Sequence, residues 1–236
     1  MTELLFRDDP YAKDCEATVT AVNSRGGIEL DRTVFYPTGG GQPGDTGVLR
    51  LADGSEIIIA TTVKGEGPED VIHVAAEGQD LPTAGTSVTA AIDWEVRHRL
   101  MRIHTCLHLL SSVVEYPVTG GQISDGRGRL DFDMPEMTVE KEAITARLNE
   151  LTAESHPVTV DWISDDELAA QPDLVRTMSV KPPMGQGRIR LIDVDGCDLQ
   201  PCGGTHVANT SEIGTVRVRK IEKKGRQNRR ISIEFS

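Results

Sequence analysis

Residues 101–110 read Met-Arg-Ile-His-Thr-Cys-Leu-His-Leu-Leu and place His104 and His108 four residues apart. Apolar residues recur around this stretch in alternating steps of four and three, at Val96, Leu100, Ile103, Leu107, Leu110 and Val114. This spacing predicts an amphipathic helix over residues 94–116, stopped by Pro117. At about 100° per residue, both histidines share one face beside the apolar stripe, so we expect them to point into a cleft rather than into the core.

A second pair of metal-competent side chains lies in 202–206, which reads Cys-Gly-Gly-Thr-His. The two glycines and the preceding proline indicate a loop. A single histidine is more often an ordinary surface or core residue, but two such pairs in a chain with six His and four Cys point to one site. Three imidazoles and a thiolate suit one tetrahedral Zn²⁺ per chain, with Cys197 as an alternative sulfur ligand. The expected ligands are His104, His108, Cys202 and His206.

Composition limits the class of protein. The chain has 236 residues and a formal net charge of −12, which argues against indiscriminate binding of nucleic acids. Its apolar runs are too short to span a membrane, its N-terminus has no secretory pattern, and four cysteines do not make a disulfide framework. We therefore expect a cytoplasmic protein without a membrane association, and no obligate protein partner is evident.

Positive charge is concentrated near the C-terminus. Residues 217–230 contain eight Lys and Arg against one Glu, and a smaller basic group of Arg97, Arg99 and Arg102 precedes the histidine pair. Such local basic faces on an acidic chain fit a phosphate-bearing partner, with Arg102 as a candidate contact. A solvated hairpin tip explains the 217–230 cluster equally well.

The fold class that the sequence predicts is α+β. Short runs with alternating or β-branched character and frequent turn residues fill 1–93, which indicates a small β-barrel domain. The periodicity changes at Asp93-Trp94, where a second domain, 94–236, begins. We expect it to pack its long helix against an antiparallel sheet. Further expected elements are a hairpin over 122–133, a helix capped by Thr138, a strand at 158–162, a capping box at Ser164, a strand at 188–194 and a C-terminal hairpin.

A glycine-rich stretch interrupts the first domain. Residues 39–47 hold five glycines, enough for backbone N–H groups to cradle a phosphate. No Gly-Lys-Ser/Thr follows and the spacing is not that of a dinucleotide fingerprint, so an ordinary strand-to-strand loop is the alternative.

Residues 101–110, taken with Asp-Leu-Gln-Pro-Cys-Gly-Gly-Thr-His-Val at 198–207, resemble the HxxxH and CxxxH motif pair of alanyl-tRNA synthetase editing domains. They resemble more closely the free-standing alanyl-tRNA editing proteins (the AlaX family) of the medium-length type. The resemblance covers essentially the whole chain. It implies hydrolysis of the ester in mischarged alanine tRNA carrying serine, with glycine as a second error, in a zinc-dependent site.

The resemblance also implies roles for particular residues. Gly39, Gly40, Gly41 and Gln42 match a glycine-rich motif that, in this family, lies against the editing site and helps to sort the aminoacyl group. Thr105 matches a threonine near the amino-acid side chain and is the candidate for recognising serine. Gln122 matches a glutamine that handles substrate near the zinc, although a turn residue is the alternative.

Physical logic explains why the editing that the resemblance implies is needed, because an alanine pocket cannot exclude glycine by size or serine strongly by one hydroxyl. An open zinc position would favour hydrolysis, whereas four simultaneous protein ligands would resemble a structural site. A tRNA-binding module with a purely structural zinc is therefore one alternative. A hydrolase of D-amino-acid esters or of another misacylated tRNA is a second.

Overall fold

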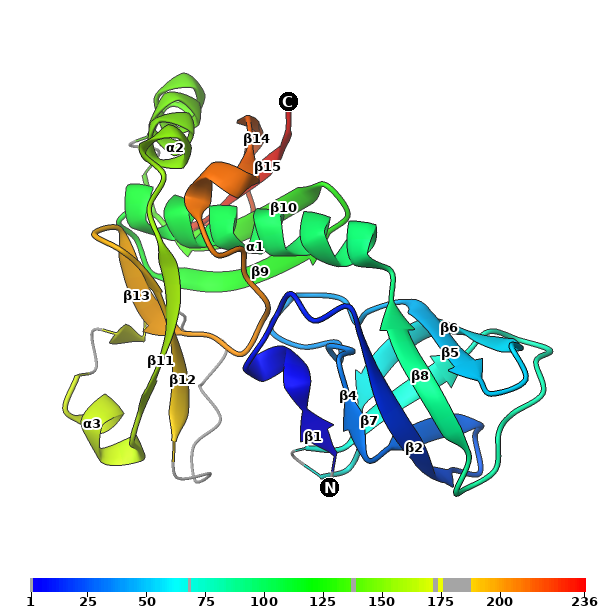
Figure 1. Cartoon of the computed structure of the whole chain (residues 1–236). Helices are drawn as coiled ribbons and strands as arrows, with labels where there is room; N and C mark the ends of the chain where they lie inside the picture. The colour runs from blue at the N-terminus through cyan, green and yellow to red at the C-terminus, as the bar shows by residue number, and fades with distance from the viewer. Residues whose placement is uncertain (1, 68, 137–138, 172–173, 176–187) are drawn as a thin grey trace. The chain divides into compact units, whose positions relative to one another are not determined.

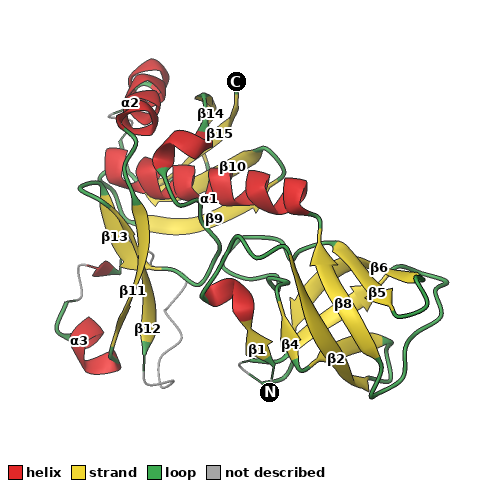
Figure 2. Ribbon diagram, in the orientation of Figure 1, coloured by secondary structure: helices red, strands yellow, loops and turns green. Residues whose placement is uncertain are grey.

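The computed structural model describes residues 2–67, 69–136, 139–171, 174–175 and 188–236 (Figure 1). The chain separates into two compact units, Met1–His98 and Arg99–Ser236. Strands outnumber helices in both units (Figure 2). The fold is therefore mixed α+β, as the sequence predicts. No helix within the described ranges combines the length and the apolar character that a membrane-spanning segment needs.

The first unit is built on a closed barrel in the strand order β2-β3-β7-β6-β5-β8. Every neighbouring pair in this barrel is antiparallel. This confirms the small barrel. Its strands are β2 Asp14–Val22, β3 Gly27–Leu30, β5 Gly47–Leu51, β6 Glu56–Lys64, β7 Val71–Ala75 and β8 Ser87–Ile92, and beside them lie β1 Glu3–Leu4, η1 Leu5–Arg7 and β4 Arg32–Thr33.

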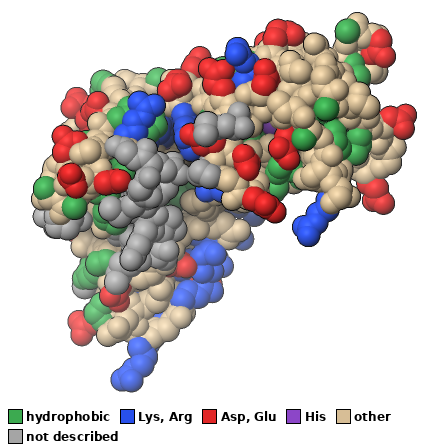
Figure 3. All heavy atoms as spheres, turned by 90° about the horizontal axis from the view of Figure 1, so that it is seen from below, with side chains coloured by type: hydrophobic (Ala, Val, Ile, Leu, Met, Phe, Trp, Pro, Cys, Tyr) green, Lys and Arg blue, Asp and Glu red, His purple; other side chains and the backbone are tan. Residues whose placement is uncertain are grey.

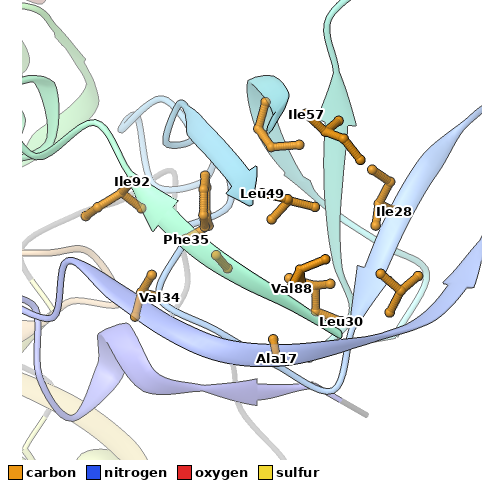
Figure 4. Packing of buried hydrophobic residues seen from close by; sticks show 12 residues of the cluster. Ala17, Ile28, Leu30, Val34, Phe35, Leu49, Ile57, Val88 and Ile92 are labelled. Carbon is orange, nitrogen blue, oxygen red and sulfur yellow. The ribbon is translucent and has the colours of Figure 1, made fainter. Parts of the chain in front are cut away.

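The barrel encloses a continuous apolar core. Alternate residues of each strand point inward, because side chains alternate between the two faces of a strand. Figure 4 shows this packing, and the labelled side chains are Ala17, Ile28, Leu30, Val34, Phe35, Leu49, Ile57, Val88 and Ile92. These residues are at most 8% exposed, so the barrel has the apolar core of an independent unit.

One histidine is buried in the barrel unit. Nδ1 of His73 lies 3.0 Å from the carbonyl of Ile28 and Nε2 lies 2.8 Å from Oγ1 of Thr33. A carbonyl only accepts, so Nδ1 carries the proton and Nε2 accepts from the threonine hydroxyl. Burial lowers the pKa of His73 to about 4, against a smaller opposing effect of the Ile28 hydrogen bond.

A buried ion pair ties the start of helix α1 (Trp94–Val113) to the end of the glycine-rich stretch. Arg97 is fully buried, and its Nε donates to both carboxylate oxygens of Asp45 at 2.9 and 3.0 Å. Its remaining nitrogens donate to the carbonyls of Pro10 and Val34. Arg97 was expected in a basic surface group, but the structure buries it. Every contact named here lies inside the first unit, so this arginine serves the barrel.

Among its described residues, the second unit has two antiparallel sheets. The larger has the order β14-β15-β10-β9, and the smaller has the order β11-β12-β13. Their strands are β9 Val118–Ser124, β10 Arg127–Asp133, β11 Val158–Ile163, β12 Ile189–Val194, β13 Asp198–Pro201, β14 Val216–Lys223 and β15 Asn228–Phe235, and the other elements are α2 Lys141–Glu154, α3 Asp165–Ala169 and η3 Thr210–Ile213.

Helix α1 packs closely on the larger sheet at Gly128. A Cβ added to this glycine would lie 2.7 Å from Ile103 and 3.1 Å from Leu107, so the helix approaches β10 only because the position has no side chain. Residues 103–111 of the helix are all buried, so burial is not confined to one apolar stripe. The sequence predicted one apolar stripe with a cleft beside it. That prediction fails because protein covers the histidine face as well.

Several local expectations can be compared with the structure. The capping box at Ser164 and both hairpins are confirmed. Helix α1 ends at Val113 rather than near residue 116, and Gly120 and Gly121 lie within β9. Thr138 lies outside the described residues, and helix α2 begins at Lys141 with Glu140 as its N-cap. Strands β5 and β13 were not foreseen.

Candidate metal centre

Four side chains from two distant segments of the second unit converge. His104 and His108 come from α1, whereas Cys202 and His206 come from the loop after β13. Their possible ligand atoms all lie within 4.8 Å of one another. Sγ of Cys202 is 3.5 Å from Nε2 of His104 and 3.3 Å from Nε2 of His206. The three histidines are buried and Cys202 is half-buried, so these residues could hold one metal ion.

Hydrogen bonds decide which nitrogen of His108 faces the cluster. Its Nδ1 lies 2.8 Å from Oδ2 of Asp198, and a carboxylate only accepts, so Nδ1 donates and Nε2 is left as the ligand atom. Gln200 donates to the same carboxylate oxygen at 2.6 Å and to Oγ of Ser111 at 3.2 Å. Burial opposes protonation of His108, but Asp198 and Cys202 raise its pKa to about 10. Carboxylate–histidine pairs of this kind orient metal ligands in many sites.

His206 is oriented in the same way by Thr105. Oγ1 of Thr105 lies 3.2 Å from Nδ1 of His206, donates to the carbonyl of Met101 at 3.0 Å, and accepts the N–H of Val207 at 3.2 Å. Since its single proton goes to Met101, the hydroxyl must accept from Nδ1–H of His206. This again leaves Nε2 for the metal. The hydroxyl's one proton and both lone pairs are then in use.

A buried arginine holds the loop that carries Cys202 through hydrogen bonds to its backbone. Nη1 of Arg190 donates to the carbonyls of Cys202 and Gly204 at 3.0 and 2.8 Å, and the N–H of Cys202 donates back to the carbonyl of Arg190. The N–H of Gly204 points at Sγ of Cys202 at 3.5 Å. This framework fixes the cysteine before any ligand binds.

The electrostatics of the cluster favour a thiolate. Burial by itself would raise the pKa of Cys202, but the neighbouring His104 and His206 and hydrogen bonds from His104 and His108 lower it well below its usual range. The pKa of His206 is lowered well below its ordinary value by burial and by the charge of His104. A thiolate beside imidazole nitrogens is the form in which these groups bind metal.

The other cysteines do not join this cluster. Cys197, the alternative sulfur ligand, is not among the four grouped residues. Cys106 is fully buried, and burial raises its pKa to about 12. Cys15 is half-buried, and burial raises its pKa to about 11. Neither is a reactive thiol.

Two further candidate site residues are engaged elsewhere in the second unit. Gln122 is exposed on β9, where its Oε1 accepts from Nε and Nη2 of Arg129 at 3.2 and 3.1 Å. Arg102 donates twice to the carbonyl of Ile213 and stacks over the ring of Phe235 at 4.1 Å. The structure therefore brings together the four expected ligands and Thr105, but groups neither Gln122 nor Arg102 with them.

The glycine-rich residues belong to the first unit. Gly39 and Gln42 exchange backbone hydrogen bonds of 3.0 and 2.9 Å around Gly40 and Gly41, which both have positive φ. Such a turn favours glycine at its two centre positions, because both have positive φ. Gly40 and Gly41 are exposed and Gln42 is fully buried. The N–H groups of Gly39 and Gln42 are used within the turn, and only its tip faces solvent.

Four supporting residues were not predicted from the sequence: Asp198, Gln200, Ser111 and Arg190. A signal for two of them was present, because Asp198, Gln200 and Cys202 alternate along an extended segment and so share one side of it. Leu199 between them is 37% exposed, whereas Asp198 and Gln200 are buried. Nothing in the local pattern marks Ser111 or Arg190.

Two family models match parts of this chain. Residues 189–232 match the family described as threonyl and alanyl tRNA synthetase second additional domain, and residues 10–96 match tRNA synthetases class II (A). An alanine–tRNA ligase of Pyrobaculum arsenaticum is 34% identical over 94% of this chain, which covers 25% of the ligase.

Two relatives match along almost their entire length. The alanyl-tRNA editing protein AlaX-M of Methanosarcina mazei is 35% identical, covering 98% of this chain and 95% of the relative. That of Methanosarcina barkeri is 36% identical, covering 98% of each. By these matches over nearly all of its length, the chain belongs to the AlaX-M family of alanyl-tRNA editing proteins.

Proposed function

We propose that this protein is a zinc-dependent aminoacyl-tRNA deacylase that hydrolyses the ester of Ser-tRNA(Ala), with Gly-tRNA(Ala) as a second substrate. The observation that carries the proposal is the convergence of His104, His108, Cys202 and His206 in a chain of the alanyl-tRNA editing family. Because tRNA charging and editing belong to translation, we propose the cytoplasm as its location.

Zinc is the metal we propose, because three imidazoles and a thiolate form a borderline-soft tetrahedral donor set. When bound, the ion supplies a Lewis acid that polarises an ester carbonyl and orients the aminoacyl group. The protein supplies orientation. Asp198 holds Nδ1 of His108 and Thr105 holds Nδ1 of His206, so that both Nε2 atoms point inward. Cys202 is the one ligand that is half-buried, so we propose that substrate approaches from its side.

Selectivity against alanine follows from hydrogen bonding. A site that binds the serine hydroxyl rejects alanine, because alanine would leave a buried polar group unpaired. The resemblance makes Thr105 the residue that reads this hydroxyl. Since the Thr105 hydroxyl already has three partners, we propose instead that it acts through His206. We propose Gln122, Arg102 and the turn Gly39–Gln42 as substrate contacts. Within this turn, Gly40 and Gly41 are the exposed residues.

The test is deacylation of Ser-tRNA(Ala), Gly-tRNA(Ala) and Ala-tRNA(Ala) in parallel, with zinc content measured on the same samples. We expect rapid loss of serine, sparing of alanine, and loss of activity in His104→Ala and after treatment with a chelator, with recovery when zinc is restored. A His156→Ala variant is the matched control, because His156 pairs with Glu154 outside the cluster.

A second candidate is a tRNA-binding module whose metal is structural. The convergence of four ligand atoms favours it, because four protein ligands close a tetrahedral site. Zinc-loaded protein that binds tRNA(Ala) but turns over none of the three esters would establish this alternative and exclude the deacylase.

A further inference from the structure

The exposed face of the larger sheet carries a shallow pocket with an excess of positive charge. Its strands all belong to the second unit. We call it the basic pocket and define it by its six cationic lining residues, Arg127, Arg129, Arg219, Lys220, Lys224 and Arg230. One carboxylate, Glu222, also lines it. In a chain of net charge −12 this is a local reversal of sign. Figure 3 shows Lys and Arg side chains gathered in the lower part of that view.

Carboxylates hold most of these cations in place. Asp131 pairs with Arg129 at 2.9 Å and with Arg230 at 2.7 Å. Glu222 pairs with Lys220 at 2.8 Å and with Lys224 at 3.3 Å. Each carboxylate thus serves two cations. The side chains are positioned in advance, and positive charge remains in excess.

Arg127 and Arg219 are less firmly engaged. They lie 3.9 and 3.8 Å from Glu234, too far for a hydrogen bond, and their side chains are 63% and 50% exposed. The side chain of Glu234 beneath them is only 15% exposed and hydrogen-bonds to Arg217 instead. The side chain of Glu234 is therefore more deeply buried than the guanidinium groups of Arg127 and Arg219, and an approaching ligand meets these guanidinium groups first.

Strand register arranges these groups in a row. Lys220 on β14 faces Ser232 on β15, which faces Arg129 on β10, which faces Gln122 on β9. At roughly 4.8 Å between strands, the row spans about 14 Å. Cations and neutral hydrogen-bonding groups alternate along it. Such a surface suits a ligand that presents both phosphates and hydroxyls.

We propose that the basic pocket docks the phosphate and ribose backbone of the tRNA substrate, a step that rests on the proposed function. RNA helices are recognised mostly through phosphates and 2′-hydroxyls, and phosphate contacts position a protein without reading sequence. A membrane surface fits less well, because the large hydrophobic residues found exposed in the described part of the chain, Ile58, Leu81, Val160 and Leu199, lie on other strands and loops.

The test uses full-length protein and uncharged tRNA(Ala), so that binding is measured without turnover. The main variant is Arg127→Gln/Arg219→Gln/Lys220→Gln, which leaves Arg217 for Glu234 and Lys224 for Glu222. The matched control removes three exposed cations elsewhere, Arg50→Gln/Lys141→Gln/Arg147→Gln. A second variant, Ser232→Glu, adds a negative charge to the row without removing an ion pair.

We expect the main variant to bind at least tenfold more weakly and to lower the slope of log Kd against log salt by about 2 to 3, since each phosphate contact contributes about 0.7 to 0.9. Ser232→Glu should weaken binding in the same direction, and the control should stay near wild type. In deacylation, the main variant should raise KM and leave kcat unchanged.

The proposal is overturned if both variants keep wild-type affinity and salt slope, or if the control loses as much as the main variant. Equal binding of wild type to anionic lipid vesicles, lost in the same variants, would also overturn it in favour of a membrane. Wild-type protein that neither binds nor deacylates tRNA would instead refute the proposed function. If the wild-type protein binds and deacylates tRNA and the variants do so equally well, only the docking surface is refuted.

Discussion

The carboxylate of Asp198 lies 2.8 Å from Nδ1 of His108, and both groups are buried. Asp198 is also the acceptor for Gln200, whose amide contacts Ser111 on the same helix as His108. One carboxylate thereby connects β13 to α1 and fixes the tautomer of a candidate metal ligand. The metal centre consequently includes more than its four ligands.

Asp198→Ala should weaken zinc binding by about 10- to 100-fold, because His108 would lose the partner that orients its ring. Competition with a chromogenic chelator measures this directly and does not depend on activity. Asp161→Ala, on the exposed strand β11, is the matched control and should keep wild-type affinity. An unchanged zinc Kd in Asp198→Ala would show that His108 needs no carboxylate.

Thr105→Val should weaken zinc binding by about tenfold, because valine keeps the shape but cannot accept Nδ1–H of His206. Thr105→Ser keeps the hydroxyl and should restore affinity. The same variants separate the two roles considered for this residue. If Thr105 reads the serine hydroxyl directly, Thr105→Val will change the preference for Ser-tRNA(Ala) over Ala-tRNA(Ala) while zinc affinity stays constant.

Asp45→Ala and Arg97→Ala should each destabilise the protein by about 3–5 kcal/mol, because either change leaves an unpaired charge in a buried position. The double variant should lose less than the sum of the two, since neither charge is then left alone. Urea unfolding followed by circular dichroism gives these values. Glu56→Ala, which breaks an exposed ion pair with Arg50, should cost at most about 1 kcal/mol.

His73 should make the protein sensitive to acid. Its pKa falls from 6.5 to about 4 on folding, so below pH 6.5 the unfolded chain binds a proton that the folded barrel does not. The free energy of unfolding should decrease as the pH falls from about 6.5 to 4. Below that range the contribution of His73 should no longer change, because the residue is protonated in both the folded and the unfolded chain. At 1.36 kcal/mol per pKa unit the full loss is on the order of 3 kcal/mol.

The measurement is urea unfolding at pH 7 and pH 5 in wild type and His73→Gln. The variant should be less stable at pH 7, yet lose less between the two pH values, because the remaining carboxylates titrate in both proteins. An identical pH dependence in His73→Gln and wild type would contradict the assignment.

The elements that can be predicted from the amino-acid pattern are those whose signal is local. The steps of three and four around His104 predict α1, alternation predicts the barrel strands and the C-terminal hairpin, and Ser164 with Glu167 predicts a capping box. The two ligand pairs were recognisable because each lies within five consecutive residues. Local periodicity and short motifs are set by backbone geometry, so they can be read without the rest of the fold.

The groups that surround those ligands are set by packing between distant segments. Asp198 lies 90 residues after His108 in the sequence, and it approaches His108 only because β13 lies beside α1, which also brings Gln200 to Ser111. Gln122, by contrast, was expected near the zinc, but the alternation of side chains along β9 turns it to the exposed face of the sheet, where it contacts Arg129. Arg97 looked like a surface charge and is a buried partner of Asp45. Burial and long-range hydrogen bonds depend on packing between segments, and a local pattern does not contain that information.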